Sequence, residues 1–271
     1  MALPNCKELI LDVKAGILTI TLNRPHKRNA MNTELVGEIT AVVDSVARDS
    51  STRAIVFRGA EGHFCSGGDI SGMNIESMDE ASAAKATWEF NRVFGRMVTR
   101  VNQAPQIIVA ALEGAVMGGG LGLACISDVA IADRNAKFSM PETGLGIIPA
   151  QIAPFVVARI GLTQARLLAL LGERIDGEEA VRIGIAHTLT QAPEEMQQEL
   201  ARVAARIRSR APNATAATKR LLFDVGVVEH EALLDAAADA FTEAMRGDEG
   251  QEGTAAFMQK RAPFWMKADE D

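Results

Sequence analysis

The sequence has few cysteines, no excess of basic residues and no long apolar run. Only Cys6, Cys65 and Cys125 occur, without paired spacing, which argues against a disulfide framework or a zinc site and favours a reducing compartment. The formal net charge of −7 argues against nucleic-acid binding, which needs a basic face. No stretch approaches the roughly 20 apolar residues of a membrane span, and the first residues carry no signal-like apolar core. We therefore expect a cytoplasmic protein that binds neither nucleic acid nor a membrane, and no metal.

The apolar pattern of the first half alternates between short strands and helices. Leu9–Val13 and Ile17–Leu22 predict a hairpin around Ala15-Gly16, and Asn32-Thr33 predict the cap of an amphipathic helix that runs to about Arg48. Further strands are expected at residues 54–57, 107–112, 128–132 and 136–139, with a long helix at about 78–103. Recurring strand, strand, helix units predict an α/β fold in which helices surround a spiral of mixed sheet.

The second half is helical almost to its end. Helices are expected at 153–171 and 177–183, and again from Glu194 onward. Segments such as 195–210 and 231–245 have the alternation of apolar and charged residues that is typical of amphipathic helices. Their apolar faces need a surface to pack on, which is either the rest of the same subunit or another subunit.

Two glycine-rich stretches each lie between an apolar run and a helix-like segment. They are residues 63–70 (HFCSGGDI) and residues 114–122 (GAVMGGGLG). Glycine lets a ligand approach the main chain closely, and a helix N-terminus adds partial positive charge. Two such N–H groups brought together would form an oxyanion hole, which activates a carbonyl without a metal. Each stretch taken singly is also compatible with a tight turn that binds nothing. A dinucleotide fingerprint with Asp133 as its acid is disfavoured, because no second βαβ half follows.

Glu142 is the candidate for acid–base chemistry. Pro141 fixes the chain before it, and the apolar residues 145–149 after it suggest a desolvated setting, where burial raises the pKa of a carboxyl group. A solvated or salt-bridged glutamate is the alternative. Cys65 has no histidine or basic partner nearby in sequence, so we expect a packing residue rather than a nucleophile.

Five motifs in the same order resemble the enoyl-CoA hydratase/isomerase (crotonase) superfamily nearly from end to end. They are Asn23-Arg24-Pro25 with Asn29-Ala30-Met31, residues 64–69, residues 114–122 with Asp128, Pro141-Glu142-Thr143 with Gly146-Ile147-Ile148-Pro149, and the tail from Glu252-Gly253 to Trp265. The resemblance implies a crotonase-type spiral of repeated ββα units over residues 1–195. It also implies a helical region over residues 196–271 that builds a homotrimer or a dimer of trimers. No cofactor is implied beyond the coenzyme A moiety of an acyl-CoA substrate.

The resemblance also assigns roles to individual residues. It implies that the N–H groups of Gly68 and Gly119 hold the thioester oxygen and that Glu142 transfers the proton. Residues implied to contact the substrate or its coenzyme A are Lys27, Arg28, Ala30, Ser66, Gly67, Asp69, Ile70, Gly118, Pro141, Leu145, Phe257 and Lys260. Among these, Lys27, Arg28 and Lys260 offer positive charge to the coenzyme A phosphates. Phe257 resembles the position that packs on adenine, from a neighbouring subunit.

The chain departs from the two-carboxylate hydratases at Gly122, where those enzymes carry a glutamate that helps to activate water. Members with a lone glutamate include double-bond isomerases, so an isomerase is the main alternative to a hydratase, and a non-catalytic acyl-CoA-binding subunit is a weaker one. The run from Pro149 to Pro154 (PAQIAP) resembles branched glutaconyl-CoA hydratases of the methylglutaconyl and isohexenylglutaconyl type, which favours hydration of a branched or glutaconyl-like substrate. The acyl chain is expected against residues 71–94, a segment that includes Met73, Ile75, Met78, Trp88 and Phe90.

Overall fold

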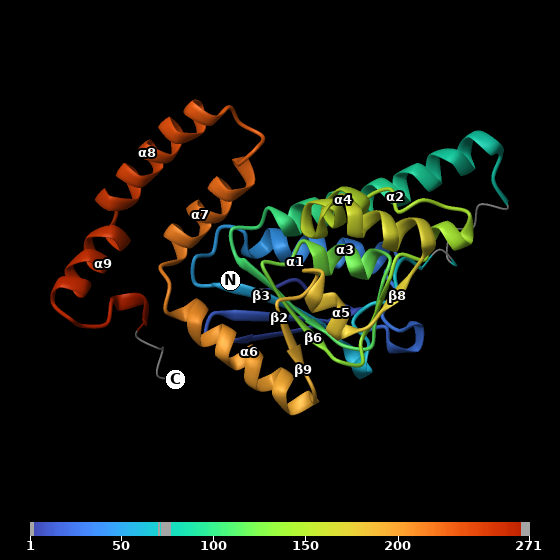
Figure 1. Ribbon diagram of the computed structural model, residues 1–271, viewed down its shortest axis with the longest axis horizontal. Helices are drawn as coiled ribbons and strands as arrows, with labels where there is room; N and C mark the ends of the chain where they lie inside the picture. Colours follow the sequence, from blue (N-terminus) through green and yellow to red (C-terminus); the bar gives the residue numbers. More distant parts are fainter. Residues whose placement is uncertain (1–2, 70, 72–76, 267–271) are drawn as a thin grey trace.

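The computed structural model describes residues 3–69, 71 and 77–266, and the chain folds there around two sheets (Figure 1). The larger sheet has the strand order β1-β2-β3-β4-β6-β9, and the smaller one has the order β5-β7-β8. The strands are β1 (Leu9–Lys14), β2 (Ile17–Leu22), β3 (Ala54–Gly59), β4 (Ile107–Leu112), β5 (Ala115–Met117), β6 (Val129–Asp133), β7 (Lys137–Ser139), β8 (Arg174–Ile175) and β9 (Thr188–Thr190). The helices are α1 (Thr33–Val46), α2 (Glu80–Asn102), α3 (Gly119–Cys125), α4 (Ala153–Leu171), α5 (Gly177–Arg182), α6 (Pro193–Arg208), α7 (Pro212–Asp224), α8 (His230–Arg246) and α9 (Asp248–Met258), with a short 3₁₀ helix, η5 (Glu142–Leu145).

The first unit begins with the hairpin that the sequence predicts. β1 and β2 pair antiparallel, and the two residues between them, Ala15 and Gly16, both have positive φ angles of 48° and 74°. A two-residue loop with positive φ at both positions matches the twist of the flanking strands, which makes it a favoured hairpin connection. The side chain of Asn32 then accepts a hydrogen bond from the Leu35 N–H and caps α1, as its sequence indicates.

Later units place one strand in each sheet. β4 pairs parallel with β6 in the large sheet, while β5, which follows β4, pairs parallel with β7 in the small sheet. Successive ββα units therefore stack as turns of a spiral. The crotonase-type α/β fold that the resemblance implies is confirmed.

Both faces of the large sheet are covered by helices. Along β3, Ile55 and Phe57 pack in the main core with α1 and α2, whereas Ala54 and Val56 face the other way into a second cluster with α6. This alternation is the two-residue period of a strand. Each large apolar side chain buried in this way contributes roughly 1.5–3 kcal/mol to folding. The α1/α2 side of the sheet carries the site described below.

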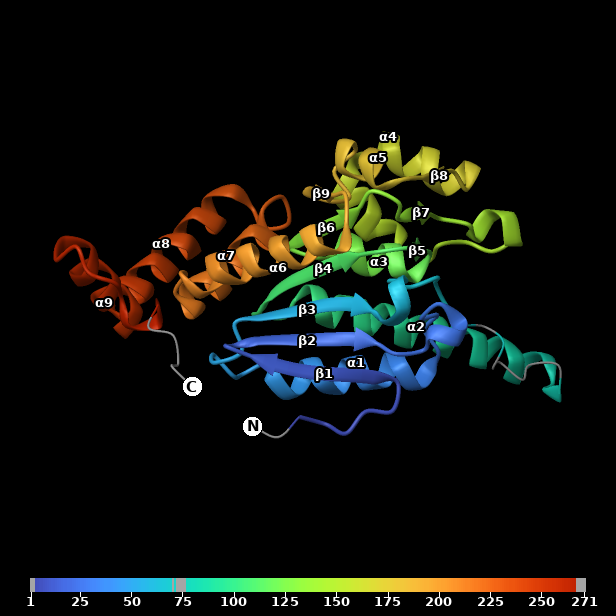
Figure 2. The same ribbon diagram turned by 90° about the horizontal axis from the view of Figure 1, so that it is seen from below.

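The last helices, α7 to α9, extend from the core as an arm (Figures 1 and 2). Where α7 leaves the core, the buried Lys219 Nζ donates to Asp128 Oδ2 at 2.6 Å and to the Gln106 carbonyl at 3.0 Å, which anchors the arm. Many apolar side chains of the arm are exposed, among them Leu222, Phe223, Val227, Leu234, Phe241, Phe257 and Met258. The boundary expected between residues 195 and 196 lies inside α6, and the apolar side of α6 packs on the sheet.

One described helix, α4, has the length and apolar composition that could cross a membrane. Its backbone is interrupted at Gly161, with φ 73° and ψ 162°, and its Arg159 guanidinium donates to the carbonyls of Ser127 and Ile185. In this fold α4 packs against α3.

Candidate active site

The two glycine-rich stretches, far apart in sequence, meet side by side. The Cys65 N–H donates to the Ala115 carbonyl at 2.8 Å, and the Met117 N–H donates to the Cys65 carbonyl at 2.9 Å. Gly67, with a φ of 113°, lies so close to the second stretch that a Cβ atom on it would be 3.4 Å from the Met117 carbonyl. The first loop therefore pairs with the edge of β5, which brings Gly68 near the start of α3.

Two backbone N–H groups from these loops face one cavity. Met31 donates to the Gly67 carbonyl and accepts from the Asp69 N–H, both at 2.8 Å, so the Gly68 N–H between them is turned away from Met31. Gly119 is the first residue of α3, where an N–H has no intrahelical acceptor. Gly68 and Gly119 both line the cavity, and neither N–H has an acceptor among the described residues. The pair has the character of an oxyanion hole.

Glu142 lies at the same cavity, at the start of η5. Its Oε1 atom is 3.0 Å from the point where a Cβ atom on Gly118 would be, and Gly118 has a φ of 51°, so glycine at this position gives both the turn and the room for the carboxylate. Its Oε2 atom is buried and has no hydrogen-bond partner in the described part of the chain. Burial raises the pKa of the Glu142 carboxyl above its ordinary value. A half-buried carboxylate with one buried oxygen that has no partner there can exchange a proton with a bound ligand.

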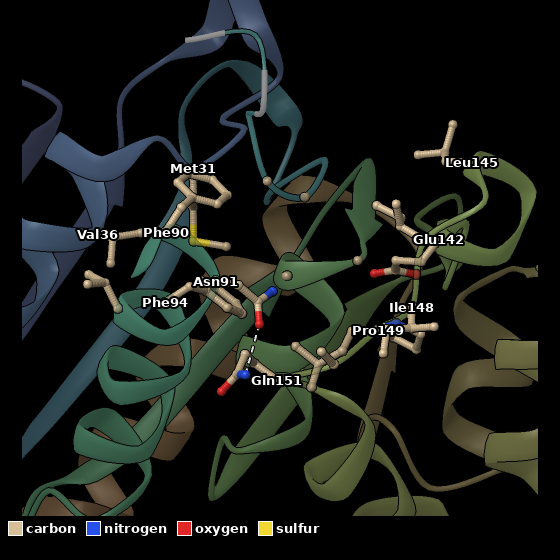
Figure 3. A pocket seen from close by; sticks show the side chains of 18 of the residues that line it. Met31, Val36, Phe90, Asn91, Phe94, Glu142, Leu145, Ile148, Pro149 and Gln151 are labelled. Atoms are coloured by element: carbon tan, nitrogen blue, oxygen red, sulfur yellow. Dashed lines mark hydrogen bonds between the residues drawn. The ribbon is translucent and has the colours of Figure 1, made fainter. Parts of the chain in front are cut away.

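The cavity has a volume of about 600 Å³ and two apolar walls (Figure 3). One wall carries Met31, Val36, Phe90 and Phe94, and the opposite wall carries Leu145, Ile148 and Pro149 beside Glu142, as Figure 3 shows. Leu145 and Ile148 remain 68% and 73% exposed, so the apolar run after Glu142 borders the cavity without closing it.

The expected acyl-chain segment lines the cavity in part. Met78 and Phe90 do so, whereas Trp88 is largely exposed and does not. Met73 and Ile75 lie outside the described residues, as does the expected substrate residue Ile70.

Several of the residues that were expected to contact the substrate near the first glycine-rich loop are joined to one another by hydrogen bonds. Ser66 Oγ donates to the Lys27 carbonyl at 3.0 Å, and the Ser66 N–H donates to the Arg28 carbonyl. Hydrogen bonds from Ser71 and then Arg24 lower the pKa of Asp69 to about 2. Asp69 is thus a charged anchor of the loop, with its carboxylate occupied by protein groups.

Sequence reasoning missed the organising role of Arg24. Its buried guanidinium donates to the Ala30 carbonyl and forms an ion pair with Asp69 at 3.0 Å. The buried Asn29 side chain accepts from the Arg24 N–H and donates to the carbonyls of Ala60 and His63. No local periodicity signals these contacts, because their partners lie up to 45 residues away.

The expected coenzyme A contacts at the C-terminus are not brought to the cavity within one chain. Phe257, at the end of α9, is 85% exposed, and Lys260 lies three residues further along the chain. Figures 1 and 2 agree that α9 lies at the end of the arm, away from the start of α2 and from β8. Cys65 is fully buried and burial raises its thiol pKa to about 12, as befits a packing residue.

Gly122 is enclosed by an apolar side chain. A Cβ atom at this position would lie 2.4 Å from Ile152 Cγ2 and 3.1 Å from Ile152 Cβ. Ile152 is buried. A glutamate therefore does not fit at position 122 unless Ile152 changes as well.

Known proteins resemble this chain in both sequence and fold. The sequence profile of the enoyl-CoA hydratase/isomerase family matches residues 12–268. The chain belongs to the enoyl-CoA hydratase/isomerase family. It is 53% identical to AtuE of Pseudomonas aeruginosa, with a TM-score of 0.93 and coverage of 96% of this chain and 100% of that one.

Two curated relatives of this family member carry different activities in their names. The chain is 30% identical to a short-chain-enoyl-CoA hydratase of Clostridium acetobutylicum, over 93% of this chain and 95% of the relative. It is 29% identical to a 1,2-epoxyphenylacetyl-CoA isomerase of Escherichia coli, over 94% and 97%. Family membership therefore gives enoyl-CoA hydratase or isomerase chemistry and leaves the choice between the two to the residues of the site.

Proposed function

We propose that this family member adds water across the 2,3-double bond of a branched or glutaconyl-like enoyl-CoA. The observation that carries the proposal is the juxtaposition, at one cavity, of the half-buried Glu142 carboxylate with the N–H groups of Gly68 and Gly119. Glu142 Oε2 has no partner, and the two N–H groups have no acceptor, among the described residues. A proton-transfer group with a raised pKa next to an oxyanion hole suits a reaction that passes through a thioester enolate.

In this proposal Glu142 both takes up and returns the one proton that is transferred. The thioester oxygen accepts hydrogen bonds from Gly68 and Gly119. A water oxygen attacks C3 while one proton of the water passes to the Glu142 carboxylate, and the electrons of the double bond move into the thioester as an enolate. The protonated Glu142 then returns that proton to C2, so the product gains one water and the enzyme is unchanged. Removing one oxyanion donor from such a site typically costs about 10²–10³ in turnover.

The glycine at position 122 is an argument for a substrate whose acyl chain is not short and straight. Ile152 occupies the space beside Gly122, so no second protein carboxylate stands there to hold the water. A carboxylate on the substrate itself, or a water ordered by Glu142 and backbone groups, would have to supply that help. Hydration of crotonyl-CoA should then be slow.

The same feature favours the second candidate, a double-bond isomerase. An isomerase needs Glu142 to remove a proton from C2 of a 3-enoyl-CoA and return it at C4, with water kept out, and an apolar Ile152 suits that requirement. A subunit that only binds acyl-CoA is disfavoured. A partly buried carboxylate that transfers no proton would weaken the binding of acyl-CoA and serve no purpose in such a subunit.

The proposal extends to the assembly, a homotrimer or a dimer of trimers in which the arm contacts a neighbouring subunit. The exposed apolar side chains of α7 to α9 support it, because they form no core with their own chain. In such an assembly Phe257 and Lys260 of one subunit would reach coenzyme A bound to another.

The test compares crotonyl-CoA, 3-methylglutaconyl-CoA and a 3-enoyl-CoA under identical conditions, by absorbance and product mass. Fast gain of one water by the branched dicarboxylic substrate supports the hydratase. Fast conversion of the 3-enoyl-CoA without a change in mass would make the isomerase correct and the hydratase wrong.

A further inference from the structure

Besides the oxyanion loops and Glu142, the polar residues that line the cavity include Glu89 and two amide side chains in contact with each other. Asn91 of α2 and Gln151, just before α4, both line the cavity, and Figure 3 shows their amides meeting between the two apolar walls. Gln151 Nε2 donates to Asn91 Oδ1 at 2.8 Å. Arg92 Nη1 donates to Gln151 Oε1 at 3.2 Å, so the guanidinium reaches the cavity through Gln151. We call these three residues the amide cluster.

The arginine fixes the direction of the whole cluster. A guanidinium only donates hydrogen bonds, so the group of Gln151 that faces Arg92 must be its oxygen. The Gln151 amide nitrogen then faces Asn91, and the group of Asn91 that faces Gln151 must also be its oxygen. The Asn91 amide nitrogen, which has no acceptor among the described residues, is left to donate to a ligand.

The cluster also carries a positive charge without a carboxylate to balance it. No carboxylate of the described residues lies within ion-pair distance of Arg92. Glu89, one helical turn earlier, also lines the cavity, and its carboxylate is paired with Lys85 at 3.9 Å. Hydrogen bonds in which one partner is ionised are stronger than neutral ones, so a donor backed by this charge prefers an anionic acceptor.

The helix itself makes room for the cluster. A Cβ atom on Gly95, inside α2, would lie 1.9 Å from Gln151 Oε1 and 3.0 Å from Arg92 Nη1. Glycine is unfavourable inside a helix. Here it allows Gln151 to lie across the helix surface between Arg92 and Asn91.

We infer that the amide cluster receives the terminal carboxylate of a dicarboxylic acyl chain whose thioester lies in the oxyanion hole. The inference deepens the proposed function and rests on it for the acyl-CoA chemistry. It makes Asn91 a ligand-contacting residue, and Gln151 and Arg92 positioning residues for specificity.

The test measures binding rather than turnover. By titration calorimetry on the full-length protein, 3-methylglutaryl-CoA is compared with its terminal amide, which has nearly the same shape without the charge. Both acyl chains are saturated, so neither can be hydrated or isomerised. The wild-type protein should bind the carboxylate at least about tenfold more tightly, the size of one charge-assisted hydrogen bond.

Three variants separate this role from a general loss of structure. Arg92→Gln and Gly95→Ala should each reduce the preference for the carboxylate to about twofold or less, with the affinity for the amide nearly unchanged. Gly95→Ala matters because alanine favours the helix, so its effect does not come from unfolding. Arg96→Gln is the matched control, since Arg96 is an exposed arginine one turn further along α2, and it should retain the full preference.

The outcomes distinguish this inference from the proposed hydration. Equal affinity of the wild-type protein for the two ligands, or a preference that survives Arg92→Gln, would overturn the amide cluster as a carboxylate subsite even if the protein hydrates enoyl-CoAs. A preference that is present and is lost in both variants would support it even if the substrate panel reveals an isomerase.

Discussion

Gly122 and Ile152 provide the sharpest stability test of this site. Ordinary contacts between carbon atoms lie at about 3.5–4.0 Å, whereas a Cβ atom at position 122 would lie 2.4 Å from Ile152 Cγ2. Overpacking a buried site typically costs about 1–3 kcal/mol, and alanine in place of glycine returns up to about 1 kcal/mol of helix propensity in α3. Gly122→Ala should therefore lower the free energy of unfolding by up to about 2 kcal/mol.

The contact also predicts which second change relieves the clash. Ile152→Ala removes Cγ2, so combined with Gly122→Ala it should give a favourable coupling of about 1 kcal/mol or more. Ile152→Val retains Cγ2 and is the matched control, with a coupling near zero. The assay is urea unfolding of the single and double variants at one fixed subunit concentration, because stability depends on concentration in an oligomer.

The functional part of this prediction concerns water activation. Gly122→Glu alone should fold poorly and gain no crotonyl-CoA hydration, whereas Gly122→Glu with Ile152→Ala has room for the carboxylate. If Gly122→Ala is more stable than the wild-type protein, or if Ile152→Val relieves the clash as well as Ile152→Ala does, then the packing described at this site is wrong.

Four further predictions concern the proposed mechanism and assembly. Glu142→Gln should reduce turnover by about 10²–10⁴ while acyl-CoA binding persists in calorimetry; near-normal turnover would remove Glu142 from the mechanism. Burial raises the pKa of Glu142, and the proposed step needs its ionised form. The rate constant kcat should therefore rise with pH, with its midpoint above the pKa of an ordinary glutamate. A kcat that does not change with pH over that range would contradict this. Gly119→Val should abolish most activity, since a Cβ there would lie 2.8 Å from Met31 Cε and 3.0 Å from Phe94 Cζ; an acyl-CoA complex in which the thioester oxygen avoids the position 119 N–H in the wild-type protein would refute the role. Sedimentation at micromolar concentration should give three or six subunits, and a folded monomer would rule out the proposed assembly.

Local sequence signals were sufficient wherever the structure depends on neighbouring residues. The hairpin at Ala15-Gly16, the cap at Asn32 and the helix Ala153–Leu171 were all predicted, because turn geometry, capping and helical periodicity act over a few residues. The short strands β5, β8 and β9 were not predicted. Runs of two or three residues show no periodicity, and these strands exist only because the edges of other strands pair with them.

Short motifs in a fixed order are enough to indicate the family, the spiral fold, and the two glycine loops and Glu142 as candidate site residues. Three features become visible only in the folded chain: Gly68 and Gly119 line one cavity, Ile152 covers Gly122, and Gln151 joins Asn91 to Arg92. Those contacts join residues 30 to 60 positions apart. Their geometry follows from how the units of the spiral stack, which no local pattern of residues encodes.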